Sequence, residues 1–208
     1  KIQQITPGVD KKIFRPNLDF PRENILLSIG RIQEQKRQLE TLMFLNNFKK
    51  IDTNFLCYFI GGPSGKSGGD YLTKLKKTVK EYDLESHVEF LGDLSQTEIK
   101  DLMNKSKLLI HTSQYETFGL VAIEANSMGV PILSINTGSL IEVIENNNNG
   151  YFSENVLDSN ANNFVKNLLN DDDYFHVVMN NCIQKSQKYF WEDTSENLLK
   201  IYQEAKLS

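Results

Sequence analysis

Cysteine is scarce in this chain: Cys57 and Cys182 are the only two among 208 residues. Both lie in apolar runs, so we expect two buried free thiols and no disulfide framework. The sequence also lacks an apolar run of the roughly 18 residues that a membrane span needs, and it shows no recognisable signal peptide. These absences favour a cytoplasmic protein.

An excess of positive charge is missing as well. Lysine and arginine number 23 against 27 aspartates and glutamates, which gives a formal net charge of −4. A chain with this balance has no general electrostatic attraction to nucleic acid, so we exclude that partner. Hydrophobic residues make up 39% of the chain, which is enough for the core of one large domain. The chain starts at Lys1 and not at a methionine, which we interpret as the mark of a fragment.

Continuous apolar runs alternate with amphipathic runs up to residue 153. Such strands are typical of a parallel sheet that helices cover on both faces, and the alternation is typical of a doubly wound α/β fold. We therefore predict one Rossmann-like domain over residues 1–208, with about six parallel strands and extra C-terminal helices. The predicted strands are 24–30, 54–62, 87–92, 107–113, 130–136 and 150–153. The predicted helices are 35–50, 70–82, 95–106, 117–129, 139–149, 158–169, 171–189 and 192–206.

The glycine-rich segment FIGGPSGKSGG at 59–69 raises the question of a P-loop. A P-loop needs a glycine five residues before Gly65, but Ile60 occupies that position, so the ring of phosphate-binding amides would be incomplete. The apolar strands also end without the aspartate that would hold magnesium. We therefore reject a nucleotide hydrolase and interpret the segment as a loop at the carboxyl edge of the sheet, the edge where ligands bind.

A more specific pattern is the pair Glu116 and Glu124, with seven residues between them. Phe118 and Gly119 open a helix directly after a strand, and the first amides of a helix favour a phosphate or pyrophosphate. Glu124 lies in the apolar run LVAIEANSMGVPIL and should be largely buried, so it needs a hydrogen-bonding partner. A nucleotide sugar has a matching shape, with hydroxylated rings at either end of a pyrophosphate.

The chain resembles the retaining glycosyltransferases of family 4, also called glycosyltransferase group 1, along nearly its whole length. YETFGLVAIEANSMGVPIL is similar to the E-x7-E motif of that family. Other segments fall in the family's order: PGVDKKIFRP, LLSIGRIQEQKRQLETL, FIGGPSGKSGG, HVEFLG, NTGSLIEVIENNNNGYF and YFWEDTSENLLKIYQEA. The family commonly has Lys-Gly where this chain has Lys36-Arg37, and Ser139 replaces a second glycine.

The resemblance implies one half of a GT-B fold, in which two Rossmann-like domains face each other across a cleft. The C-terminal domain binds the nucleotide-sugar donor and the N-terminal domain binds the acceptor. This chain resembles only the C-terminal domain, so the missing N-terminal domain is an expected partner. Any peripheral membrane contact is expected only through the missing part.

The resemblance also implies roles for the residues that would hold the donor. Arg31 and Lys36 would clasp its pyrophosphate, and Gly30 would let the backbone pass close to it. Glu116 is the predicted catalytic residue, which would bind hydroxyls of the transferred sugar and stabilise positive charge at the anomeric carbon. Glu124 would bind the ribose hydroxyls.

Further donor contacts are implied through the main chain. Phe118, Gly119 and Leu120 would offer backbone amides to the phosphates. Leu91 and Gly92 would contact the nucleobase, and Gly62 would line the donor cleft.

No metal or other cofactor is expected, because the basic pair and the helix N-terminus can do the work of magnesium. Asp171, Asp172 and Asp173 stand where a helix begins, so we interpret them as capping residues and not as metal ligands. We interpret all three histidines, including His111, as structural or exposed.

The sequence thus predicts the donor-binding half of a retaining glycosyltransferase, nearly inactive on its own. Two alternatives stay open: a nucleotide-sugar-binding module that works with a separate partner, and a phosphorylase or epimerase on the same scaffold.

Overall fold

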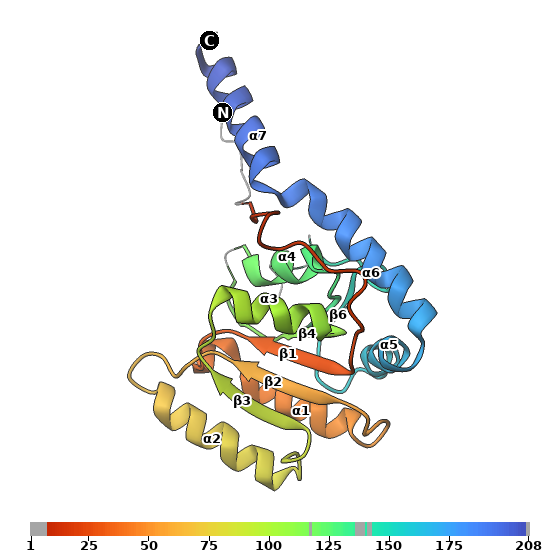
Figure 1. Ribbon diagram of the computed structural model, residues 1–208. Coiled ribbons are helices and arrows are strands. Elements are labelled where there is room, and N and C mark those ends of the chain that lie inside the picture. Colours follow the sequence, from red (N-terminus) through yellow and green to blue (C-terminus); the bar gives the residue numbers. More distant parts are fainter. Residues whose placement is uncertain (1–7, 117, 136–139, 141–142, 207–208) are drawn as a thin grey trace.

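In the part of the chain that the structure describes, six strands form one parallel sheet in the order β3-β2-β1-β4-β5-β6 (Figure 1). The structure is a computed structural model, and it describes residues 8–116, 118–135, 140 and 143–206. The strands are β1 (Ile25–Ile29), β2 (Leu56–Ile60), β3 (Val88–Gly92), β4 (Leu108–His111), β5 (Ile132–Ile135) and β6 (Gly150–Ser153). This sheet confirms the predicted doubly wound α/β class.

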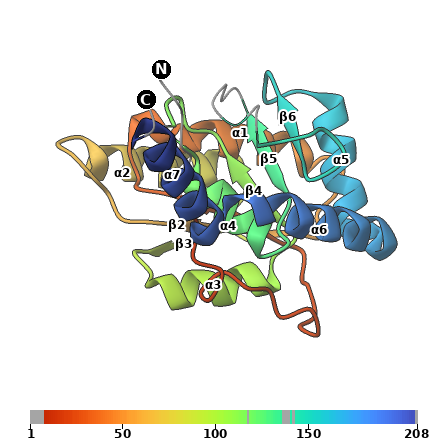
Figure 2. The same cartoon turned by 90° about the horizontal axis from the view of Figure 1, so that it is seen from above.

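Helices cover both faces of the sheet. They are α1 (Gln38–Phe48), α2 (Gly68–Glu81), α3 (Gln96–Lys105), α4 (Leu120–Ser127), α5 (Ser159–Asn170), α6 (Asp172–Ser186) and α7 (Trp191–Lys206), with 3-10 turns η1 (Glu34–Lys36) and η3 (Gln187–Tyr189). Seen from above, α3 lies on one side of the sheet and α1 on the other (Figure 2). Neighbouring residues of β1 accordingly face different cores: Leu26 belongs to the cluster that includes residues of α1, α2 and α5, whereas Leu27 belongs to the cluster that includes residues of α4 and segment 9–14.

Several helix starts follow from local capping. Ser95 and Glu98 form the predicted capping box at α3. The Asp171 side chain accepts a hydrogen bond from the Tyr174 amide at 2.9 Å, which confirms the interpretation of this acidic run as a helix start.

Both cysteines are buried free thiols, as predicted, and burial raises the pKa of each.

The predicted helix 35–50 was wrong at its start. Residues 34–36 form η1 instead, and α1 begins only after Arg37, whose φ of 52° and ψ of 38° place it in the left-handed region. The predicted helix 117–129 likewise begins only at Leu120, because Gly119 is left-handed with a φ of 65°. At the C-terminal side, α6 ends at Ser186, so the predicted helix 171–189 ran three residues too far.

The predicted helix 139–149 was wrong over residues 143–149, which form turns and a β-bridge residue and no helix. Leu140 is a 3-10 residue, and residues 136–139 and 141–142 lie outside the described residues. The buried Asn149 explains this, because its side chain accepts from the Glu145 amide at 2.8 Å and donates to the Val143 carbonyl at 2.9 Å. Asparagine side chains that satisfy nearby backbone groups in this way compete with the helix.

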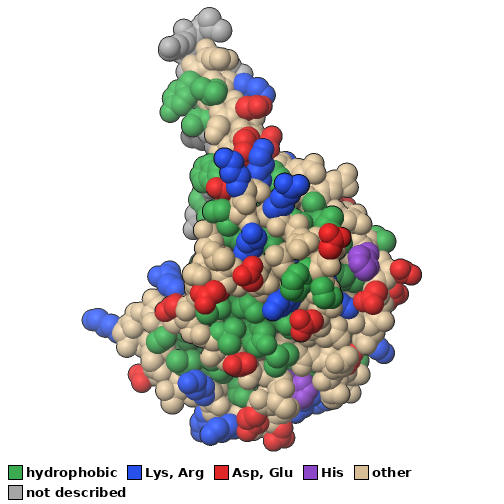
Figure 3. All heavy atoms as spheres, viewed as in Figure 1, with side chains coloured by type: hydrophobic (Ala, Val, Ile, Leu, Met, Phe, Trp, Pro, Cys, Tyr) green, Lys and Arg blue, Asp and Glu red, His purple; other side chains and the backbone are tan. Residues whose placement is uncertain are grey.

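The last helix stands apart from the rest of the fold. Figure 1 shows α7 extending away from the sheet, and Figure 3 shows apolar side chains on its surface. Within the described ranges, no helix is long and apolar enough to cross a membrane.

Candidate functional site

A cleft of about 470 Å³ opens at the carboxyl ends of β1 and β4. These two strands are neighbours although about 80 residues separate them, and in such sheets the loops after the two central strands diverge and leave a crevice. The cleft is lined by Ile29, Gly30, Arg31, Lys36, Glu116, Phe118, Gly119, Leu120, Val121 and Glu124. Eight of the eleven residues predicted from the sequence therefore lie together.

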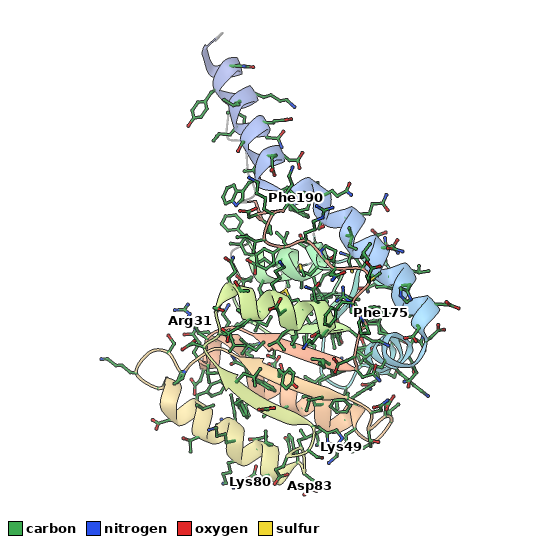
Figure 4. The ribbon with its side chains drawn as sticks, in the orientation of Figure 1. Arg31, Lys49, Lys80, Asp83, Phe175 and Phe190 are labelled. Atoms are coloured by element: carbon green, nitrogen blue, oxygen red, sulfur yellow. The ribbon has the colours of Figure 1, made fainter. Side chains whose placement is uncertain are left out.

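The loop after β1 brings two of its three cationic residues, Arg31 and Lys36, to the cleft. Arg31 is exposed and lies at the end of the sheet to which the strands run (Figure 4). Its carbonyl accepts a hydrogen bond from Gln38 Nε2 at 2.9 Å. The Lys36 carbonyl accepts from Thr112 Oγ1 at 2.9 Å, which ties this loop to the end of β4. Hydrogen bonds from Gln38 and from Thr112 thus hold the backbone at Arg31 and at Lys36.

Glu116 and Lys36 meet across the cleft. Lys36 Nζ donates to Glu116 Oε2 at 3.0 Å, and His111 Nε2 lies 3.5 Å from the same oxygen. The contact with His111, followed by the bond from Lys36, lowers the pKa of Glu116 from 4.5 to about 2, although partial burial opposes the shift. Glu116 is therefore ionised at every physiological pH.

His111 is a neighbour of the site that the sequence did not identify as such. It is the last residue of β4, and its side chain is 4% exposed. Its place at the carboxyl end of a central strand, five residues before Glu116, was the available signal. Ile29 and Val121 were missed too, since an apolar residue beside a selected one has no distinguishing chemistry.

The N-terminus of α4 forms another wall of the cleft. Gly119 precedes the helix with a φ of 65°, and a Cβ at this position would collide with the buried side chain of Leu140. Glycine is thus favoured here by backbone conformation and by space. Phe118 and Leu120 are 41% and 40% exposed and give the mouth of the cleft an apolar border. The first amides of α4 and its helix dipole favour an anion at this point.

Glu124 lies one turn further along α4. It is largely buried, as expected, and the part of its side chain that stays exposed borders the cleft. Burial raises its pKa. Its environment therefore disfavours the bare charge, whereas a hydroxyl donor placed in the cleft would stabilise it.

Three of the predicted residues are not brought into the cleft. Gly62, Leu91 and Gly92 lie at the same edge of the sheet, but at the ends of β2 and β3. The Gly62 amide donates to Asp93 Oδ1 at 2.7 Å, and its carbonyl accepts from the Ile32 amide at 2.8 Å. Both backbone groups of Gly62 are therefore occupied within the protein.

In the described part of the chain, neither a metal site nor a larger hollow competes with this cleft. Among the described residues, no group of three or more His, Cys, Asp or Glu side chains is placed to hold a metal ion. A larger hollow of about 660 Å³ lies between segment 11–18 and α6 with η3, lined partly by Lys11, Lys12 and Arg15. It is away from the strand ends, so the smaller cleft is the better candidate.

Comparison with known sequences places the chain among proteins of one kind. A family model described as glycosyl transferases group 1 matches residues 9–189. A D-inositol 3-phosphate glycosyltransferase of Catenulispora acidiphila is 26% identical over 221 residues, covering 99% of this chain and 52% of that protein. An uncharacterized glycosyltransferase of Methanocaldococcus jannaschii is 28% identical, covering 95% and 52%. The chain thus spans about half the length of the curated relatives it matches.

Solved structures with the same fold include longer chains and a single domain. Anabaena HepE, solved in complex with UDP-glucose, has a TM-score of 0.82 at 20% identity and covers 97% of this chain and 57% of that protein. Staphylococcus aureus TarM has a TM-score of 0.78 at 25% identity, covering 96% and 38%. The C-terminal domain of a group 1 glycosyl transferase from Francisella tularensis has a TM-score of 0.76 at 21% identity, covering 88% of this chain and all of that one.

Proposed function

Because the chain belongs to the glycosyl transferases of group 1, we propose that it is the donor-binding half of a retaining hexosyltransferase of family 4. The whole protein would transfer a sugar from a nucleotide diphosphate sugar to an acceptor in the cytoplasm. The observation that carries this proposal is the ion pair of Lys36 and Glu116 at the N-terminus of α4, which places a cation, a carboxylate and helix amides around one cleft.

The chemistry of transfer accounts for each of these groups. The bond between the anomeric carbon and the β-phosphate oxygen breaks, and its electron pair stays on the departing nucleoside diphosphate. Arg31, Lys36 and the first amides of α4 would stabilise that negative charge. The acceptor oxygen bonds to the anomeric carbon on the face that the phosphate leaves, and its proton passes to the phosphate.

The two glutamates would act at opposite ends of the donor. Glu116 would accept hydrogen bonds from the transferred sugar and stabilise positive charge at its anomeric carbon. Glu124 would accept from the ribose hydroxyls, and the main chain of Leu91 and Gly92 would contact the base. We propose that no metal takes part, since the two cations and the helix amides supply the positive charge.

The acceptor site belongs, in this proposal, to a domain outside the chain. The length of the curated relatives, about twice that of this chain, supports a second domain. We therefore expect the isolated chain to bind donor and to catalyse transfer barely at all.

Calorimetric titration with UDP, GDP and their sugar conjugates, without added metal, tests the proposal. We expect one nucleotide to bind, with the affinity reduced about ten- to hundredfold in Lys36→Ala and in Glu124→Ala, because each loses a hydrogen bond that involves a charged group. Lys74→Ala, on the exposed side of α2, is the matched control and should bind like the wild type. Unchanged affinity in both site variants, or no binding of any nucleotide by the longest natural polypeptide that contains this chain, would refute the proposal.

A further inference from the structure

His111 is a buried titratable group beside the cleft to which the proposed function gives no role. Its Nε2 is one of five buried side-chain nitrogen or oxygen atoms that make no hydrogen bond within the described residues. Leaving a buried polar atom unsatisfied is costly, so such an atom calls for an explanation. Glu116 Oε2 lies 3.5 Å from His111 Nε2 and is a possible hydrogen-bond acceptor.

The distance between His111 Nε2 and Glu116 Oε2 is too long for a good hydrogen bond while Lys36 Nζ is bonded to the same oxygen. Lys36 Nζ stands 3.0 Å from Glu116 Oε2 and takes the closer position. Because the ionised carboxylate only accepts, the contact with His111 is attractive only when Nε2 carries a proton. The Glu116 carboxylate therefore has Lys36 as its hydrogen-bonded partner and His111 as a second, more distant neighbour.

Lys36 and His111 differ in the conformational freedom of their side chains. Lys36 has a long flexible side chain whose ammonium can turn toward a phosphate. His111 has a short side chain at the end of a central strand and is enclosed on nearly all sides. When a pyrophosphate attracts Lys36, the histidine stays in place beside the carboxylate.

We propose that His111 is a positioning residue, which donates an Nε2–H bond to Glu116 when Lys36 engages the donor pyrophosphate and so keeps the carboxylate directed at the transferred sugar. This inference rests on the proposed function for the step that involves the donor. The other charged groups that border the cleft are Arg31 after β1 and Glu124 on α4.

A titration of the Glu116 carboxyl carbon by NMR tests the contact without any donor. Lys36→Met imitates the state in which the lysine has left. We expect Glu116 in Lys36→Met to keep a pKa below 4.5, and the double variant Lys36→Met, His111→Leu to titrate at least about one unit higher. Equal titration in these two variants would overturn the proposal. His176→Gln, on the exposed face of α6, controls for the loss of a histidine elsewhere and should leave the titration unchanged.

Kinetics of the longest natural polypeptide that contains this chain test the positioning step. With the conjugate of UDP or GDP that binds, His111→Leu should lower kcat about ten- to hundredfold, while the affinity for the free nucleotide stays within about twofold. His111→Gln keeps a donor near the place of Nε2 and should recover a large part of kcat. A loss of nucleotide affinity equal to the loss of kcat, or no recovery with glutamine, would indicate a merely structural residue. No nucleotide binding by the wild type would refute the proposed function and the donor-dependent step, whereas the NMR titration decides the contact separately.

Discussion

Arg37 stands at the junction of η1 and α1 with a backbone conformation that costs an L-residue about 1–2 kcal/mol. This is the position where the resembled family commonly has glycine, and the left-handed backbone gives the physical reason. An ion pair between Arg37 and Glu40, at 3.4 Å, partly offsets this backbone cost. Both side chains are partly buried, and a pair three positions apart on a helix contributes only a few tenths of a kcal/mol.

The comparison of Arg37→Gly with Arg37→Ala isolates the backbone cost. Both variants lose the pair with Glu40, but only glycine adopts the left-handed conformation freely. We expect Arg37→Gly to exceed Arg37→Ala in free energy of unfolding by about 1 kcal/mol. Urea denaturation of the two variants measures the difference, and equal stability would show that the backbone here is unstrained.

The depressed pKa of Glu116 makes its contribution to stability depend on pH. Because the folded-state pKa of about 2 is below the ordinary 4.5, ionised Glu116 stabilises the fold at pH values above 4.5, and the effect is lost as the pH falls toward 2. We expect Glu116→Gln to be less stable than the wild type by about 1–2 kcal/mol at pH 7. Urea unfolding between pH 7 and pH 2.5 should show this gap closing below pH 4.5.

Glu124→Gln is the matched contrast, since burial raises the pKa of Glu124. Its ionised form is disfavoured in the fold, so the amide should be as stable as the wild type or more stable at pH 7. For Glu116→Gln, a difference in free energy of unfolding from the wild type that stays unchanged down to pH 2.5 would contradict the ion pair with Lys36.

At the scale of whole elements, Arg22 joins three helices. Its Nη1 donates to the carbonyls of Met103 at 2.6 Å and Ser106 at 3.0 Å, and its Nη2 donates to the Met128 carbonyl at 2.7 Å. These carbonyls belong to the C-terminal ends of α3 and α4, where acceptors lack partners within the helix. Its guanidinium also lies over the ring of Phe175 on α6, and burial lowers its pKa to about 10.

Replacing Arg22 with methionine should therefore loosen the α3–α4–α6 face. We expect Arg22→Met to lower the free energy of unfolding by about 2–4 kcal/mol, because at least two carbonyls lose their donor. Arg15→Met, at an exposed position of the same segment, is the control and should change it by less than about 0.5 kcal/mol. Thermal and urea unfolding measure both, and similar stabilities would rule out this role of Arg22.

At the scale of the whole molecule, α7 leaves the fold with an apolar face uncovered. Trp191, Leu199 and Tyr202 are 50%, 60% and 62% exposed. Exposed apolar side chains grouped in this way favour association with another surface. We propose that a second copy of the chain covers this surface when the chain is alone in solution.

The double variant Leu199→Glu, Tyr202→Lys tests this interpretation. We expect the free energy of unfolding to change by less than about 0.5 kcal/mol, because both side chains are exposed, while self-association of the chain decreases. Sedimentation velocity over a range of concentrations measures the association, with Lys200→Gln as the control on the same helix. A loss of stability above about 1 kcal/mol would mean that α7 packs against its own chain.

The sequence by itself determined most element types, the fold class and the residue types that line the cleft. Periodicity, capping residues and residue type are local properties, so the capping box of Ser95 and Glu98 was visible, as was a Glu116–Glu124 pair at a helix start. The errors fell where a local signal was overridden, as at Arg37 and at Asn149.

Only the tertiary structure decided which of these residues meet. Lys36 and Glu116 are 80 positions apart and touch because β1 and β4 pair in the sheet. The same pairing brings His111 to the carboxylate, whereas Gly62, whose amide bonds to Asp93, is not among the residues that line the cleft. Strand order and side-chain contacts depend on the packing of the whole chain, and no local pattern in the sequence specifies them.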